Sequence, residues 1–128
     1  EDWEGTYELK PYGITDGALR FQKDMYKGGL HVLSFHMKKL LPIGRGGMVL
    51  TDDKEAYDWL KRARFDGRRE LPLEDDTFDM IGWNMYMTPE QAIRGLQIFS
   101  TINQKVLRDL DSHVQGYPNL SKYDVYVS

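Results

Sequence analysis

Two short apolar runs, separated by a loop rich in glycine, constrain the fold of this chain more than any other feature. The runs cover residues 30–35 and 46–51, and both have the length and composition of strands. The connection between them, residues 36–45, is shorter than the roughly dozen residues that a parallel crossover needs. Upstream, the closely spaced glycines and prolines of residues 5–29 favour loops and short extended pieces. We therefore expect one antiparallel hairpin in the first half of the chain.

A first helix is expected directly after the second apolar run. Asp52 can act as its N-cap, and Glu55 lies three residues on, at the spacing of a capping box. Gly67 is expected to end this helix. Residues 68–81 then form an acidic, proline-containing loop, which we expect to be mobile or ordered only by a partner. The apolar residues of the helix recur at helical spacing: Ala56, Trp59, Leu60 and Ala63.

A second helix has the strongest start signal in the chain. Thr88 can cap it, Pro89 suits the first helical position, and Gln91 completes a capping box. The helix is expected to run to about Val114, and alternation in residues 123–127 predicts a terminal strand. Its predicted apolar stripe consists of Ala92, Leu96, Phe99, Ile102, Val106, Leu107, Leu110 and Val114.

Composition excludes several classes of function. The 128 residues correspond to one domain or to part of a larger one, and the net charge of -3 offers no electrostatic footprint for nucleic acid. The chain has no cysteine, which excludes disulfides, thiol catalysis and cysteine-based zinc sites and is consistent with a cytoplasmic location. No apolar run approaches the roughly 20 residues of a membrane span. The three histidines lack metal-ligand spacing with nearby carboxylates, so no metal site is expected.

The hairpin loop contains the first candidates for chemistry. Lys39 can form a Schiff base with an aldehyde cofactor if its neighbours lower its pKa. The alternative is that Lys38 and Lys39 are two solvated lysines after a strand. Ser34 and the backbone N–H groups of residues 44–47 suit a phosphate, although the pattern is not that of a Walker loop. The alternative for these glycines is a turn that simply needs their conformations.

Other polar residues are weaker candidates. Asp2 could pair with the ring nitrogen of a cofactor, or it could be an exposed acid. Asn84 lies just before the second helix and could help that helix end to hold an anion, or it could be a turn residue. His36 could line a substrate site, whereas His31 is expected to be structural or exposed. The basic run of residues 61–69 is expected to be mainly a solvated helix end, with phosphate binding as the alternative.

Two separated patterns in the chain occur together in one known family. In the first, Ser34 and Phe35 are followed by a lysine five positions after the serine, then by Gly44-Arg45-Gly46-Gly47 and the strand MVLTDD. The second pattern is GWNMYMTPEQA, residues 82–92. In this order the two patterns resemble the DegT/DnrJ/StrS family of PLP-dependent sugar aminotransferases. The resemblance extends from about residue 29 to residue 110.

This resemblance implies a role for several residues. It implies that Lys39, rather than Lys38, forms the Schiff base with PLP. Ser34 falls where the family contacts the cofactor phosphate, and Asn84 falls where an asparagine reaches the phosphate of the neighbouring subunit. Asp2 falls where a carboxylate pairs with the pyridinium nitrogen.

The resemblance also implies a fold. We expect the α/β class, and specifically the second half of a fold-type I PLP-transferase large domain with its hairpin and long helix. Residues 1–116 would belong to this partial large domain, and residues 117–128 would start the C-terminal small domain. The chain therefore resembles the middle segment of a longer enzyme.

The implied function is amino transfer from an amino acid, expected to be glutamate, to a keto sugar nucleotide. A cytoplasmic homodimer is implied, without nucleic-acid or membrane partners, and the isolated chain is expected to be incomplete. One alternative is a non-catalytic truncated relic, or a dimerising interaction module, that keeps part of the fold. Tyr86, where the family usually has arginine, and Asp66, where it often has histidine, favour that alternative. The second alternative is a phosphate- or nucleotide-binding domain that uses residues 44–47 without PLP.

Overall fold

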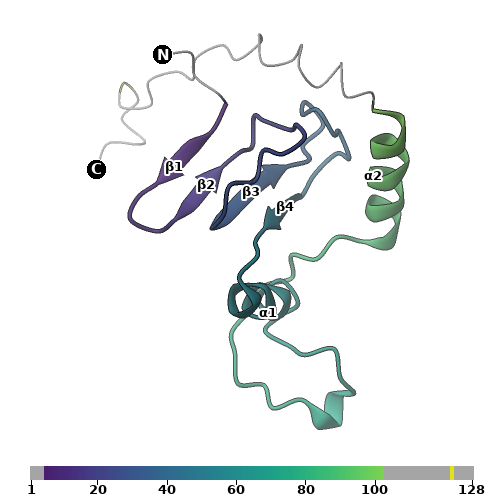
Figure 1. Ribbon diagram of the computed structural model, residues 1–128. Coiled ribbons are helices and arrows are strands. Elements are labelled where there is room, and N and C mark those ends of the chain that lie inside the picture. Colours follow the sequence, from purple (N-terminus) through teal and green to yellow (C-terminus); the bar gives the residue numbers. More distant parts are fainter. Residues whose placement is uncertain (1–4, 103–121, 123–128) are drawn as a thin grey trace.

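A mixed four-stranded sheet forms the centre of the molecule (Figure 1). The computed structural model describes residues 5–102 and Lys122. Strands lie in the order β1-β2-β3-β4; the β1–β2 and β3–β4 pairs are antiparallel and the β2–β3 pair is parallel. The predicted hairpin is confirmed as the β3–β4 pair, in which Val32 lies opposite Val49. The strands are β1 (Tyr7–Leu9), β2 (Ile14–Asp16), β3 (Leu30–Ser34) and β4 (Gly47–Leu50).

Strand β3 separates a buried face of the sheet from a more open one. Its side chains alternate, so that His31 and Leu33 are buried while Val32 and Ser34 are only half-buried. Ser34 therefore points to the face opposite the core. The buried apolar cluster consists of Met25, Leu33, Phe35, Leu41 and Ile43, and the partly buried side chains against it are Phe21, Leu50, Met87, Ile98 and Ile102.

Helix α1 (Lys54–Ala63) begins one residue later than predicted. Its N-cap is Asp53, whose carboxylate accepts the backbone N–H groups of Glu55 at 2.9 Å and Ala56 at 3.1 Å. The prediction that Asp52 caps the helix is wrong, because the Asp52 carboxylate instead accepts the hydroxyl of Tyr26 at 2.8 Å. The two aspartates are adjacent, so the local pattern could not distinguish them.

The end of α1 also differs from the prediction. The helix ends at Ala63, which is buried, rather than continuing to Gly67. Trp59, one of the helically spaced apolar residues, is 52% exposed. Two others of that spacing, Ala56 and Leu60, are half-buried.

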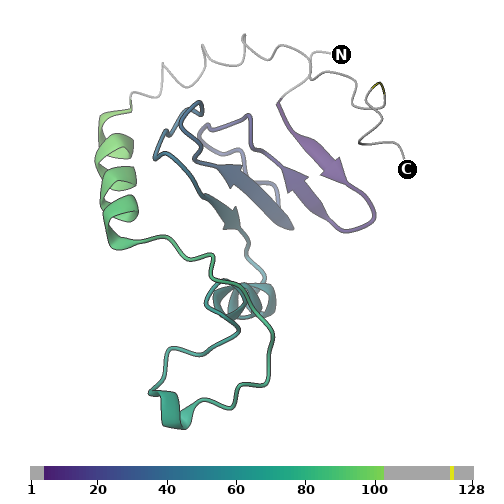
Figure 2. The same cartoon turned by 180° about the vertical axis from the view of Figure 1, so that it is seen from behind.

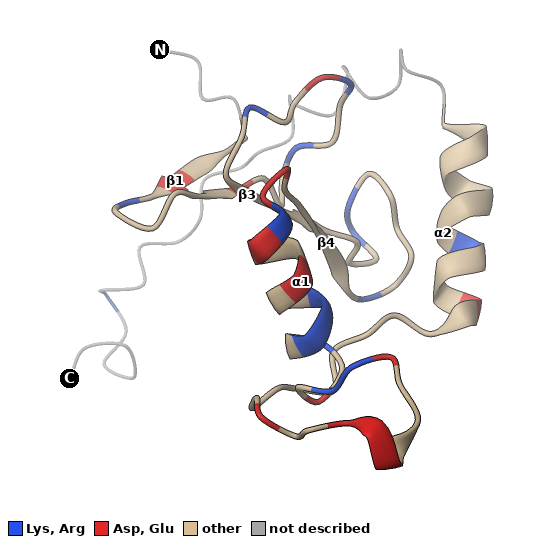
Figure 3. Ribbon diagram, turned by 60° about the horizontal axis from the view of Figure 1, so that its bottom comes forward, with Lys and Arg blue, Asp and Glu red and all other residues tan. Residues whose placement is uncertain are grey.

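Residues 68–81 form a projection that we call the arm. It lies beyond α1, on the far side of that helix from the sheet, and contains the short helix η1 (Leu73–Asp75) (Figures 1 and 3). The Arg69 guanidinium lies 2.9 Å from the Asp79 carboxylate and 3.6 Å from Asp76, and Arg62 also pairs with Asp79. These contacts all lie within the chain, and the expectation of a mobile or partner-ordered loop stays a prediction.

The two ends of the arm pass each other in close backbone contact. Gly67 has a φ of +78°, and a Cβ built on it would lie 1.9 Å from the carbonyl oxygen of Met80. A Cβ on Gly82 would lie 1.9 Å from the backbone nitrogen of Gly67. Only glycine fits at either position, so this crossing closes the base of the arm.

Helix α2 (Pro89–Thr101) has the predicted N-terminus and an earlier end. The Thr88 side chain accepts the N–H of Gln91, and the Gln91 side chain accepts the N–H of Thr88, which confirms the capping box. Ile102 is extended, so the prediction of one continuous helix to about Val114 is wrong. Residues 103–114 and the predicted strand at 123–127 lie outside the described part of the chain.

The apolar residues of α2 form two faces rather than the single predicted stripe. Gly95 is buried, and Ile98 and Ile102 pack on the core cluster. Leu96 and Phe99 are 69% and 56% exposed, although the Phe99 ring meets Phe21 edge-on at 6.1 Å. The view from behind shows α2 along the side of the sheet next to β4 (Figure 2). No helix within the described residues is long and apolar enough to cross a membrane.

Candidate cofactor site

The loop of residues 36–46 lies at the end of the sheet where β3 ends and β4 begins. Leu41 and Ile43 are buried and fasten the loop into the core. The backbone N–H of Phe35 donates to Gly46 at 2.9 Å, and the N–H of Gly44 donates to Phe35 at 3.1 Å. These contacts hold the loop in one shape at the sheet end.

The glycines of this loop have a structural requirement of their own. Gly44 and Gly46 have φ values of +122° and +90°, which favour glycine. A Cβ on Gly47 would lie 2.1 Å from the carbonyl oxygen of Leu33, so the backbones of β3 and β4 could not approach as they do. The turn alone thus accounts for this glycine pattern.

His36 links the two predicted cofactor residues of the loop through its backbone. Its N–H donates to the Ser34 Oγ at 3.4 Å, and its carbonyl oxygen accepts the N–H of Lys39 at 2.8 Å. The His36 Nδ1 accepts the N–H of Lys38 at 3.3 Å. Ser34, His36 and Lys39 therefore share one tight turn at the end of β3, and His36 is exposed beside the other two.

The chemistry of this turn fits a phosphorylated aldehyde cofactor. Such a group needs a primary amine near its carbonyl and hydrogen-bond donors near its phosphate. Lys39 is half-buried, and it forms no ion pair with any residue of the described ranges. The Ser34 hydroxyl accepts one long bond, and no residue among 5–102 accepts its proton; a Cβ on Gly44 would meet open space.

Asn84 lies on a different part of the molecule. It is exposed and forms an isolated antiparallel bridge with Phe65, just beyond α1. The flanking Trp83 donates its N–H to Ala63 at 2.7 Å. None of the hydrogen bonds among the described residues joins Asn84 to Ser34, His36 or Lys39. Within one chain, Ser34, His36 and Lys39 therefore lie together, and Asn84 lies apart from them. Asp2 lies outside the described residues.

The comparison with protein families covers both patterns noted in the sequence. Residues 23–114 match the DegT/DnrJ/EryC1/StrS aminotransferase family. The chain belongs to this aminotransferase family. Its members are PLP-dependent aminotransferases, so this chain is aminotransferase-like and PLP is the cofactor that the family uses. The comparisons with curated proteins and with solved structures gave no match. The small α/β fold described above is compatible with part of a PLP-transferase fold.

Two departures from the aminotransferase pattern have a local structural role. Tyr86 packs edge-on against Phe65, with ring centroids 5.3 Å apart, and Asp66 has a φ of +55°. The Asp66 N–H donates to Trp83 at 3.1 Å. Both residues therefore join the end of α1 to the segment that carries Asn84.

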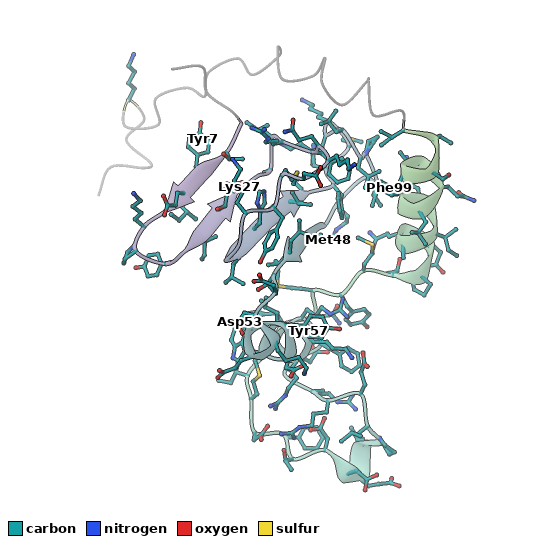
Figure 4. All side chains as sticks on the ribbon, in the orientation of Figure 1. Tyr7, Lys27, Met48, Asp53, Tyr57 and Phe99 are labelled. Atoms are coloured by element: carbon teal, nitrogen blue, oxygen red, sulfur yellow. The ribbon has the colours of Figure 1, made fainter. Side chains whose placement is uncertain are left out.

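Helix α2 supports the loop of residues 36–46 from the side. A Cβ on Gly95 would lie 2.6 Å from Ile43, so the helix approaches the loop as closely as a glycine allows. A Cβ on Gly46 would lie 3.8 Å from Met87, which immediately precedes the helix cap. The side-chain view shows Met48 on β4 and Phe99 on α2 at this end of the molecule (Figure 4). Contacts from α2 thus fix the loop that carries Lys39.

His31 is structural, in agreement with one of the two expectations. It is 3% exposed, and a Cβ on Gly17 would lie 2.2 Å from its Nε2, so glycine makes room for the ring. Burial, together with the nearby Arg20 guanidinium, lowers the pKa of His31. A polar cavity of about 200 Å³ beside it is lined in part by Arg20, Asp24 and Lys27, and none of the predicted site residues lines it.

Several structural residues gave no signal in the sequence. The Tyr26 hydroxyl joins the segment before β3 to Asp52 after β4, a contact between residues 26 positions apart. In the basic run, Lys61 pairs with Glu70 at 2.7 Å and Arg62 pairs with Asp79. These cations are already paired with carboxylates, which disfavours the phosphate alternative for this run. Within residues 5–102 and at Lys122, no group of three or more histidines and acids could hold a metal ion.

Proposed function

We propose that this chain carries the lysine end of a PLP site in a sugar aminotransferase. The reaction would transfer an amino group from an amino acid, expected to be glutamate, to a keto group of a sugar nucleotide. The observation that carries this proposal is the family match over residues 23–114, which includes the lysine loop and the Asn84 segment in one order. The shared turn of Ser34, His36 and Lys39 supports it.

Each residue of the proposed site would have a defined role. The Lys39 amine would hold the cofactor and, once displaced by the amino donor, would move a proton at the substrate carbon. The Ser34 hydroxyl would donate a hydrogen bond to the phosphate, and His36 would contact the substrate. Asp2 would hold a proton on the ring nitrogen. Bound PLP would supply the electron sink that makes the substrate carbon acidic.

The assembly that we propose is a cytoplasmic homodimer. Asn84 lies apart from Ser34 and Lys39 within one chain, and this placement suits a phosphate contact across a subunit interface. Residues 1–116 would belong to the large domain and residues 117–128 to the start of the small one.

A non-catalytic interaction module is the second candidate. Tyr86 stands where the family usually has arginine, and Asp66 stands where it often has histidine. In this chain the Tyr86 ring packs on Phe65, and the backbone N–H of Asp66 donates to Trp83. A chain that keeps the hairpin and the capped helix without binding PLP would also explain the family match.

A spectroscopic titration distinguishes the two candidates. We expect the purified chain, mixed with PLP, to gain the absorption band of a lysine-linked cofactor. Lys39→Ala should lose this band because the amine is gone, whereas the neighbouring Lys38→Ala should keep it.

Circular dichroism of the same samples provides the control for folding. A folded wild-type chain that gives no band would contradict the PLP site and favour the interaction module. A band that survives in Lys39→Ala but disappears in Lys38→Ala would show that the wrong lysine was chosen.

A further inference from the structure

The polar cavity beside His31 lies apart from the Lys39 turn. Its volume is about 200 Å³, whereas a single water needs only roughly 10–15 Å³. His31 lies near the start of β3 and Ser34 at its end, so the two residues are roughly 10 Å apart along the strand. Because side chains alternate along a strand, they also point to opposite faces of the sheet. The cavity is therefore a separate feature from the proposed cofactor site.

The walls of this cavity are anchored in the core. Met25, one of the lining side chains, is 8% exposed and belongs to the buried apolar cluster. The backbone N–H of Gln22 donates to the Met25 Sδ at 3.2 Å, and the N–H of Arg20 donates to the carbonyl oxygen of Gly17 at 2.9 Å. The segment that supplies most of the lining is thus held in place before any ligand binds, as in most small-molecule sites.

His31 adds a buried polar group that the described part of the chain does not satisfy. The ring is 3% exposed, and its Nε2 has no hydrogen-bond partner among residues 5–102. Buried polar atoms nearly always have a partner, so an unpaired one in a cavity wall points to a bound molecule. Burial and the Arg20 guanidinium lower the pKa of His31, and the neutral ring offers one donor and one acceptor.

The charges around the cavity favour an anion. Arg20 and Lys27 provide two cations, and Asp24 provides the one acid of the lining. Lys27 lies on the segment between β2 and β3 (Figure 4) and forms no ion pair with any residue of the described ranges. An ammonium group that is not already paired is available to bind an anion.

The polar groups of the lining also indicate which anion fits. The Gln22 side-chain amide, which forms no hydrogen bond among residues 5–102, is a donor. The Asp24 carboxylate accepts hydrogen bonds only, so it requires a hydroxyl group on the ligand. A singly protonated phosphate group has both features, since its oxygens accept from Lys27 and Gln22 while its P–OH donates to Asp24.

We propose that this cavity binds a small phosphate compound, either inorganic phosphate or a phosphate monoester, at a site separate from the Lys39 turn. Arg20 and Lys27 balance the charge of the phosphate, and Gln22 and Asp24 fix its orientation. The inference goes beyond the proposed function, because no residue of the cavity belongs to the proposed cofactor site.

Isothermal titration calorimetry of the full chain with sodium phosphate, at constant ionic strength, tests the site. Lys27→Gln should raise the Kd roughly tenfold because a charge-assisted hydrogen bond is lost, and Gln22→Met should raise it roughly threefold. The matched control is Lys23→Gln, which makes the same change at a lysine of the same segment that does not line the cavity. It should leave the Kd within about twofold, since it removes only a screened surface charge. Circular dichroism checks that each variant is folded.

Two further titrations locate the phosphate and identify its source. The double variant Ser34→Ala with Lys39→Ala removes the proposed cofactor contacts and should leave the phosphate Kd within about twofold of wild type, because neither residue lines the cavity. Glycerol phosphate, a small monoester, should bind more tightly than inorganic phosphate if the cavity takes an ester. Equal or weaker binding of the ester would identify free phosphate as the ligand.

Several outcomes would overturn the inference. These are a folded wild-type chain that binds no phosphate, equal Kd values for Lys27→Gln and Lys23→Gln, and loss of phosphate binding in the double variant. The PLP absorption band separates this inference from the proposed function. Phosphate binding that depends on Lys27, without a PLP band, would contradict only the proposed function, whereas a band without such binding would contradict only the cavity site.

Discussion

At the scale of single residues, the carboxylate of Asp79 has the most perturbed environment among the described groups. Hydrogen bonds from Arg69 and Arg62 lower the pKa of Asp79 to about 2, below the value of about 3.9 expected in an unfolded chain. Because the folded-state pKa is the lower one, this group stabilises the fold fully above about pH 4, and that contribution is lost as the pH falls toward 2. We predict that Asp79→Asn is less stable than wild type at neutral pH and that the difference shrinks on acidification.

Urea unfolding, followed by tryptophan fluorescence, measures this difference at each pH. Glu74→Gln is the matched control, because Glu74 is an exposed arm carboxylate that forms no ion pair with the described residues. A constant difference between Asp79→Asn and wild type from pH 7 to about pH 2 would contradict the assignment.

At the scale of elements, the start of α2 depends on the capping box. Thr88→Ala removes the acceptor for the Gln91 N–H, and we predict a loss of about 1 kcal/mol in the free energy of unfolding. Thr88→Ser keeps the hydroxyl and should remain close to wild type. Thermal and urea unfolding by circular dichroism would measure both variants. Equal losses in the two variants would show that the methyl group of Thr88, not its oxygen, stabilises the helix.

The sequence predicted correctly the hairpin and the α2 cap, which depend on neighbouring residues, but it did not predict contacts between residues far apart in the chain. The hairpin and the α2 cap depend on residues close together in the chain, and both are confirmed. Asp52 failed as a cap because its carboxylate is bonded to Tyr26, which no local pattern shows. Likewise, β2 pairs in parallel with β3 through a helix-free connection, and pairs such as Arg62–Asp79 join the arm to α1. The candidate site divides in the same way: Ser34, His36 and Lys39 share a turn, whereas the position of Asn84 depends on a bridge to Phe65.

At the scale of the whole molecule, a small core supports a large exposed apolar surface. Only six hydrophobic side chains in the described ranges are buried, and Leu33 is one of them at 4% exposure. We predict that Leu33→Ala costs about 2–5 kcal/mol, which is a large part of the stability of a chain this size. Leu96→Ala makes the same change at a side chain that is 69% exposed and should be nearly neutral. Urea unfolding would compare them, and equal costs would mean that Leu96 is covered in solution.

The glycine crossing at the base of the arm also bears on how this part of the chain can evolve. Gly67 and Gly82 bring the two ends of the arm together, so the path of the chain from α1 to α2 does not depend on what lies between them. Insertions, deletions or substitutions within the arm can then change its reach and its charge without moving the sheet or the Lys39 turn. Selection can therefore vary the arm separately from the fold, as long as both glycines are kept.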